Sequence, residues 1–124
     1  MIHSRLIGFV ATQRPALARK FYEETVGLVF ISEDPFAIVF DMSGTMLRVQ
    51  KVRELVAAQH TVLGWQVPDI HAAVEGLMKR GARFETFAGL AQDESGVWMS
   101  PSGAKVAWFK DPDGNMLSLT EFPK

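Results

Sequence analysis

The end of the chain carries a single carboxylate in a setting that could make it a binding group. Glu121 closes an extended run that follows the turn sequence Asp111-Pro112-Asp113-Gly114. Proline presets φ for the second position of a tight turn, and glycine relieves the fourth. A turn followed by a strand would hold this carboxylate at a fixed depth in a sheet. Strand parity places Glu121, Leu119 and Leu117 on one face, which we expect to line a cleft.

Two basic side chains are further candidates for binding. His60 could hydrogen-bond a ligand or act as a general base near neutral pH, or it could be a connector histidine without a role. Arg48 is the only charged residue within Met46–Val49, so it could bind a carboxylate or phosphate bidentately. It could equally extend to solvent along its aliphatic stem. His3 and His71 are assigned no role.

Aromatic residues could supply flat surface to a ligand. Trp98 and Trp108 lie on either side of a predicted hairpin turn at 101–103, so they could stack on a planar molecule together with Phe40. The alternative is that they pack in the core. Nine Phe, six Met and three Trp suit an apolar, aromatic cavity, an ordinary core or a dimer interface.

The chain contains an internal repeat. Gly44–Lys51 matches Gly114–Glu121 position for position, and 6–12 is similar to 62–68. A helix-like segment follows the first strand of each copy, which predicts a repeated β-α-β-β-β unit. We expect one domain, 1–124, with modules at about 1–55 and 60–124. Lys51 is the counterpart of Glu121, so the two could form an ion pair across a cleft, or they could be two solvated strand ends.

The segments Phe21–Leu28 (FYEETVGL) and Asp111–Asn115 (DPDGN) carry a family resemblance. With the repeat, they resemble two-module members of the vicinal oxygen chelate superfamily, which includes glyoxalase I, bleomycin-resistance proteins and extradiol dioxygenases. The resemblance implies an α+β fold in which two βαβββ modules form curved mixed sheets around a cleft, with a helix outside each sheet. It does not select a reaction, because this scaffold serves many chemistries.

The resemblance also implies four metal-ligand positions, at Ile7 (or Leu6), Lys51, Val62 and Glu121. Only Glu121 is a ligand type, and a lysine ammonium would repel a divalent cation. We therefore expect no metal and no other cofactor. The alternative is a poor site made by Glu121, His60 and Gln50, if a β-bulge turns Gln50 into the Lys51 position.

Composition narrows the possible partners. The chain has 124 residues, a net charge of −1 and no cysteine. These values give no reason to expect binding to nucleic acid or an anionic membrane, and they exclude disulfides and thiolate chemistry. No signal-peptide core or membrane-spanning stretch is present, so we expect a cytoplasmic protein. An apolar fraction of 48% leaves material for a homodimer interface.

The predicted elements place these residues. Helices are expected from Pro15 to Val26, ended by Gly27, and from Asp69, as N-cap, to Arg80. The least regular segment, 87–95, is a candidate loop at a cavity mouth. Strands are expected at 4–11, 28–32, 36–41, 46–52, 61–67, 82–85, 96–100, 104–109 and 115–121.

The functional hypothesis combines the resemblance with these residues. We expect a glyoxalase/bleomycin-resistance-like protein that binds a small, partly apolar molecule in a cleft without a metal. The expected ligand-binding residues are Glu121, His60, Lys51, Arg48, Phe40, Trp98 and Trp108. One alternative is a metal-dependent lyase or dioxygenase with an atypical site. Another is a structural or regulatory dimer that binds no ligand.

Overall fold

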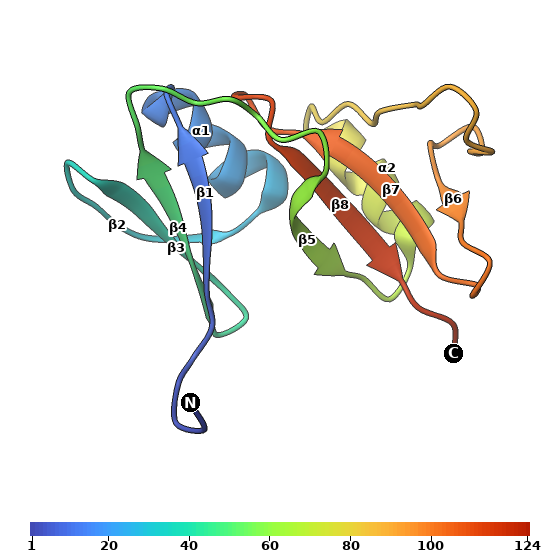
Figure 1. The fold of residues 1–124 in the computed structure, drawn as a ribbon, viewed down its shortest axis with the longest axis horizontal. Helices are drawn as coiled ribbons and strands as arrows, with labels where there is room; N and C mark the ends of the chain where they lie inside the picture. Colours follow the sequence, from blue (N-terminus) through green and yellow to red (C-terminus); the bar gives the residue numbers. More distant parts are fainter.

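The computed structural model describes all residues, 1–124, and contains two four-stranded mixed sheets (Figure 1). Sheet A has the order β1-β4-β3-β2, and sheet B has the order β5-β8-β7-β6. In each sheet the first and last strands of a module pair in parallel, and the other pairs are antiparallel. The predicted α+β class and two-module arrangement are confirmed. The strands are β1 (Ile7–Thr12), β2 (Val29–Glu33), β3 (Ala37–Met42), β4 (Thr45–Lys51), β5 (Thr61–Gln66), β6 (Trp98–Met99), β7 (Lys105–Lys110) and β8 (Met116–Glu121).

Both predicted helical regions form, and a capping residue sets one end of each. Helix α1 (Pro15–Lys20) continues as a π-helical segment, η1 (Phe21–Val26), which ends at Gly27 with φ of 89°. Glycine adopts this left-handed conformation at little cost, so it stops the helix. Helix α2 (Ile70–Lys79) begins after Asp69, whose carboxylate accepts a hydrogen bond from the Ala72 amide. No helix is long and apolar enough to span a membrane.

Both helices contribute to one core that the two sheets share. A single cluster of 17 buried apolar residues includes side chains from both sheets and both helical regions. In η1, Phe21 stacks on Phe109 of β7 with ring centroids 6.2 Å apart, whereas Tyr22 packs 6.0 Å from Phe40 of β3. The first helical region therefore packs against both sheets, whereas the resemblance implied a helix outside each sheet. Figure 1 shows α1 between sheet A and sheet B.

This packing gives each sheet two distinct faces. The core face of sheet A carries Leu47 and Val49, and that of sheet B carries Leu117 and Leu119, all buried. We call the other two faces the open faces. Since both core faces turn toward one shared core, the two open faces point away from each other within one chain.

Two strands expected in the second module differ from the prediction. Residues 82–85 form no strand and contribute only an isolated bridge between Phe84 and Phe109. Of residues 96–100, only Trp98 and Met99 are paired with β7. Phe84 instead packs its ring on Phe109, with centroids 5.2 Å apart. Side-chain burial, rather than a backbone ladder, therefore fixes the segment 82–85.

Candidate functional site

The open face of sheet B carries an aromatic cluster made by Phe87, Trp98 and Trp108. The centroids of Trp98 and Trp108 lie 6.1 Å apart, and Phe87 meets Trp108 edge to face at 5.4 Å. The two tryptophans are neighbours because β6 and β7 pair antiparallel around the predicted turn. Both are only half-buried, so the cluster presents ring surface to solvent. Its geometry suits stacking against a planar molecule.

A cavity of about 390 Å³ adjoins this cluster. It lies where the connector between the sheets crosses the end of sheet B, and Phe87 of the aromatic cluster forms part of its wall. The remaining walls are Ala57, Ala58, Gln59, Lys110, Gly114 and Met116. The loop 87–95 is irregular, as predicted, although only its first residue borders the cavity.

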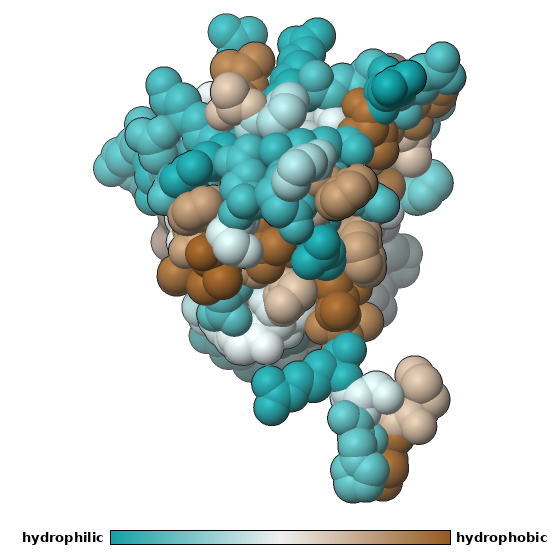
Figure 2. Space-filling view, turned by 90° about the vertical axis from the view of Figure 1, so that its left-hand side faces the viewer, coloured by the Kyte–Doolittle hydropathy of each residue, from teal (hydrophilic) through white to brown (hydrophobic).

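The open face of sheet A is apolar around one arginine. Arg48 pairs in register with Phe9 of β1 and Val39 of β3, so these three residues form a row across the sheet. No carboxylate lies within 4 Å of the Arg48 guanidinium, since it takes part in no ion pair. Phe9 is 52% exposed, and Ile7 and Met46 beside it are also exposed. Figure 2 shows apolar side chains gathered among polar ones on this side of the molecule.

Lys51 and Glu121 do not approach each other. The Lys51 ammonium lies 2.7 Å from Glu33 and also donates to the Asp34 carbonyl oxygen. The hydrogen bond with Lys51 is the largest cause of the lowered pKa of Glu33. Lys51 therefore fastens β4 to the end of β2. Of the two alternatives, an ion pair across a cleft is therefore not formed, because Lys51 pairs with Glu33 whereas Glu121 binds the Ile70 amide and Lys105.

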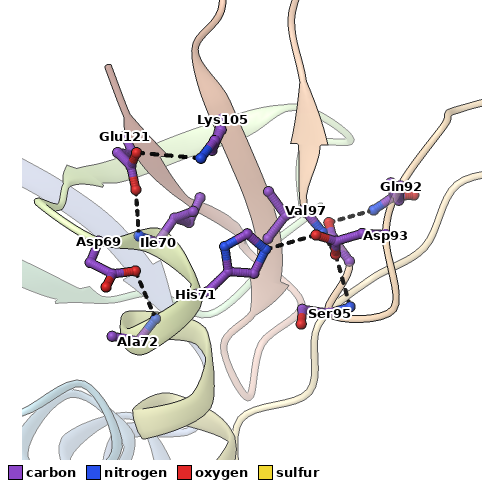
Figure 3. Close-up of polar contacts among 11 residues, drawn as sticks. Asp69, Ile70, His71, Ala72, Gln92, Asp93, Ser95, Val97, Lys105 and Glu121 are labelled. Carbon is purple, nitrogen blue, oxygen red and sulfur yellow. Dashed lines mark hydrogen bonds and ion pairs between the residues drawn. The ribbon is translucent and has the colours of Figure 1, made fainter. Parts of the chain in front are cut away.

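Glu121 stabilises the start of helix α2 (Figure 3). Its Oε1 accepts a hydrogen bond from the Ile70 amide at 2.9 Å, and its Oε2 lies 3.7 Å from the Lys105 ammonium. The first amides of a helix lack partners within the helix, and a negative charge there is favourable. The face that Glu121 shares with Leu119 and Leu117 covers the core, and it is not exposed as a cleft wall.

The remaining predicted residues do not converge on one site. His60 is exposed in the connector before β5 and makes no side-chain hydrogen bond, and Phe40 is completely buried in the core. Gln50 lies in a regular part of β4, because the bulges occur in β2 and β5. A side chain at Gly64 would not fit, since its Cβ would lie 3.0 Å from the Ser118 hydroxyl.

The four positions implied as metal ligands do not share a face. Ile7 is exposed on the open face of sheet A, whereas Lys51 and Glu121 lie on core faces. The rows across the middle of the open faces contain Phe9 and Arg48 in sheet A and Gly64 and Ser118 in sheet B. No three His, Asp or Glu side chains gather anywhere in the structure. The donor set does not fit a divalent cation, which needs several oxygen or nitrogen ligands.

A buried polar network that sequence reasoning missed joins the two modules. The inter-module clasp consists of Thr12, Tyr22, Asp111, Asp113 and Asn115. The Asp111 carboxylate accepts four hydrogen bonds: from the Tyr22 hydroxyl (2.7 Å), the Asp113 amide, and the Asn115 amide and side chain. Asn115 also donates to the Ala11 carbonyl oxygen, and Thr12 donates to Asp113. The Asp-Pro-Asp-Gly-Asn motif was visible in the sequence, but its partners lie about a hundred residues away.

Burial and the neighbouring Asp111 charge raise the pKa of Tyr22 far above its ordinary value. Desolvation disfavours the charged phenolate, and a nearby carboxylate disfavours it further. The hydroxyl is therefore a hydrogen-bond donor at neutral pH and not a general base.

A second contact, which we call the loop latch, joins His71 on α2 to Asp93 in the loop 87–95. His71 Nε2 lies 2.7 Å from Asp93, whose other oxygen accepts hydrogen bonds from the Ser95 and Val97 amides (Figure 3). The bond with His71 is the main cause of the lowered pKa of Asp93. The latch holds this loop, and hence the start of the strand that carries Trp98.

Solved structures share this architecture over nearly the whole chain. A glyoxalase/bleomycin resistance protein/dioxygenase from Nocardioides has a TM-score of 0.74 at 17% identity, covering 98% of this chain and 84% of its own. The chain has the glyoxalase/bleomycin resistance/dioxygenase fold. The same fold occurs in lactoylglutathione lyase from Agrobacterium tumefaciens, with a TM-score of 0.69, 16% identity and coverage of 96% and 93%. TnmS3, an antibiotic-binding protein from Streptomyces sp. CB03234, has a TM-score of 0.73 at 22% identity, with coverage of 97% and 96%.

These similarities confirm the predicted resemblance at the level of the fold. No protein-family model matches the sequence, and no curated protein sequence is similar to it. The glyoxalase/bleomycin resistance/dioxygenase fold is therefore recognised in this chain by its architecture. The name of the fold includes both enzymes and binding proteins, so the reaction or ligand must be argued from this chain's own residues.

Proposed function

We propose that this protein binds a flat, partly apolar small molecule against the aromatic cluster of Phe87, Trp98 and Trp108. The observation that carries the proposal is the exposed ring surface of this cluster beside a cavity. Small-molecule sites are mostly apolar with a few polar groups that fix orientation. TnmS3, an antibiotic-binding protein with the same fold, is an example of small-molecule binding on this scaffold.

The second wall of the site comes from a second copy of the chain. The open faces of sheets A and B point away from each other in one chain, so a cleft between two such faces requires two chains. The open face of sheet A offers Phe9, Ile7 and Met46 as apolar wall and Arg48 as a cation with no carboxylate within 4 Å. An aromatic acid satisfies both walls, because its ring can stack and its carboxylate can pair with the guanidinium.

The ligand binds without a metal or another cofactor. The support for this part of the proposal is the residue set: no carboxylate or imidazole lies in the middle rows of the open faces. An enzyme of the lyase or dioxygenase type would need such ligands. Elemental analysis of protein purified without chelator tests this directly, and about one equivalent of zinc, nickel or iron per chain would contradict it.

A matched set of variants tests the site with 2-naphthoate as the probe. We expect 2-naphthoate to quench tryptophan fluorescence and raise Tm, because a ligand that binds only the native state stabilises it. Trp108→Leu removes an aromatic contact worth about 1 kcal/mol and should weaken binding roughly fivefold. Arg48→Gln should weaken 2-naphthoate but not naphthalene. Phe36→Leu, at an exposed turn outside both open faces, is the control. Equal affinities in all three variants would refute the site.

A further inference from the structure

A groove lies between the two modules at the end opposite the inter-module clasp. Two cavities of about 290 and 160 Å³ share Met42, Trp65 and Gln66 as wall residues, so they adjoin along one line. Together they fall in the lower part of the range of about 300–1,000 Å³ that is typical of small-molecule sites. The groove borders the core side of the sheets, and its smaller end is lined by Phe109 and Leu119 of the core cluster. Met46 and Gly64 also line its larger cavity, so that end of the groove reaches the edge of the open faces.

The walls of this groove are apolar and incompletely sealed. The larger cavity is lined by Leu28, Leu47 and Leu63, and the smaller one by Val26 and Leu77. Several of the apolar wall residues are only half-buried. These are Val26, Leu63, Trp65, Val67 and Ala73. Protein interiors are normally packed as densely as organic crystals. An apolar chain in the groove would remove this exposed surface from water, which is favourable.

One charged residue lines the groove. Arg80 follows the last turn of α2 and borders the smaller cavity, whose other walls are apolar apart from Gln66. The Arg80 Nε donates to the Thr25 carbonyl oxygen at 2.8 Å, which holds the side chain across the module boundary. No carboxylate lies within 4 Å of the Arg80 guanidinium. Its terminal nitrogens are therefore free for an acidic group, which a guanidinium binds with fork geometry.

We propose that the groove binds a single-chain amphiphilic anion, such as a medium-chain fatty acid, with its tail along Trp65 and its carboxylate at Arg80. Charge complementarity selects this ligand class, because the groove contains one unpaired cation and no anion. A neutral apolar ligand would gain nothing from Arg80, which is exposed and hydrated. A cationic amphiphile would meet a like charge.

Decanoate, decanol and decyltrimethylammonium, each below its critical micelle concentration, test the proposal by calorimetry on the full chain. We expect one decanoate per chain and weaker binding of the other two probes. Arg80→Gln should weaken decanoate about tenfold and leave decanol unchanged, whereas Arg80→Lys should restore part of the affinity. Arg83→Gln, which removes a nearby cation outside the groove, is the matched control.

Two further variants distinguish binding in the groove from binding elsewhere on the protein. Ala73→Leu should fill part of the smaller cavity and weaken both decanoate and decanol, and each variant's thermal unfolding shows that it is folded. Trp108→Leu should leave decanoate binding unchanged, so this proposal and the naphthoate site fail independently. Equal decanoate affinity in Arg80→Gln and Arg83→Gln would overturn the proposal. The absence of decanoate binding would also overturn it. A change of oligomeric state that accounts for all of the measured heat of binding would do the same.

Discussion

At the scale of single residues, the buried carboxylate of Asp111 connects the two modules through hydrogen bonds. A buried charge is costly unless it is fully hydrogen-bonded, and Asp111 accepts four hydrogen bonds. One of them comes from Tyr22 in the first module, so loss of this bond weakens the joint between modules.

Tyr22→Phe tests the inter-module clasp. The change removes one donor from Asp111 and leaves the ring in place, so the free energy of unfolding at pH 7 should fall by about 1–3 kcal/mol. Urea unfolding followed by circular dichroism measures it. If Tyr22→Phe were as stable as the wild type, the Asp111 carboxylate would not depend on the hydrogen bond from Tyr22.

The raised pKa of Tyr22 also predicts how stability depends on alkaline pH. The folded state keeps the phenol protonated, whereas the unfolded chain ionises near its ordinary pKa of about 10. The contribution is therefore complete below about pH 10 and is lost as the pH rises above it. Tyr22 is the only tyrosine, so tyrosinate absorbance should appear together with unfolding and not before it.

At the scale of elements, Glu121 connects strand β8 to helix α2. It caps the Ile70 amide, next to the N-cap Asp69. The position that sequence reasoning assigned to ligand binding therefore has a structural task in this chain.

Glu121→Gln should lower stability and not the affinity for a ligand on the open faces. It removes the charge at the helix N-terminus and weakens the cap, which together are worth about 0.5–1 kcal/mol. Lys105→Gln is the control, because it removes the ion pair and keeps the cap. Denaturant unfolding of both variants separates the two contributions. A Glu121→Gln protein with full stability but weaker 2-naphthoate binding would restore this carboxylate to the site.

The loop latch should open in acid. Because the folded-state pKa of Asp93 is lowered, its contribution to stability is present above the ordinary pKa and is lost as the pH falls through the folded value. Both partners are nearly half exposed, so the effect on global stability should stay below about 1 kcal/mol. The protection of the Ser95 and Val97 amides from hydrogen exchange, relative to their intrinsic rates, should fall below about pH 4. Asp93→Asn should show a flatter pH dependence, and an equal loss of protection in this variant would argue against the latch.

At the scale of the whole molecule, the open faces decide whether one chain is sufficient to form the ligand-binding cleft. The open face of sheet A exposes Phe9, Ile7 and Met46 on a surface without a covering helix. Contiguous apolar surface of this kind commonly marks an interface.

We therefore predict a dimer at micromolar concentration, measured by size-exclusion chromatography with light scattering. Phe9→Glu should shift it toward monomer and abolish 2-naphthoate binding, because it places a charge in the middle of the apolar row. Phe36→Glu, at an exposed turn, should change neither. A wild-type monomer that binds 2-naphthoate at full affinity would refute the two-chain cleft.

The sequence alone determined the modules, the helix ends and the main strands. These features depend on local signals: the repeat of Gly44–Lys51 in 114–121, the cap at Asp69 and the left-handed Gly27. The neighbouring tryptophans were also predictable, because a short hairpin turn places them on adjacent strands.

Only the tertiary structure decided which faces are covered and which groups meet. Phe21 and Tyr22 are neighbours in sequence but pack on different sheets, and this places η1 against both modules. The core faces then include Lys51 and Glu121, which parity alone could not orient, since alternation separates two faces without saying which is buried. Contacts such as Tyr22 with Asp111 join residues 89 positions apart. Such contacts arise when the two modules pack together, and no local sequence pattern predicts that packing.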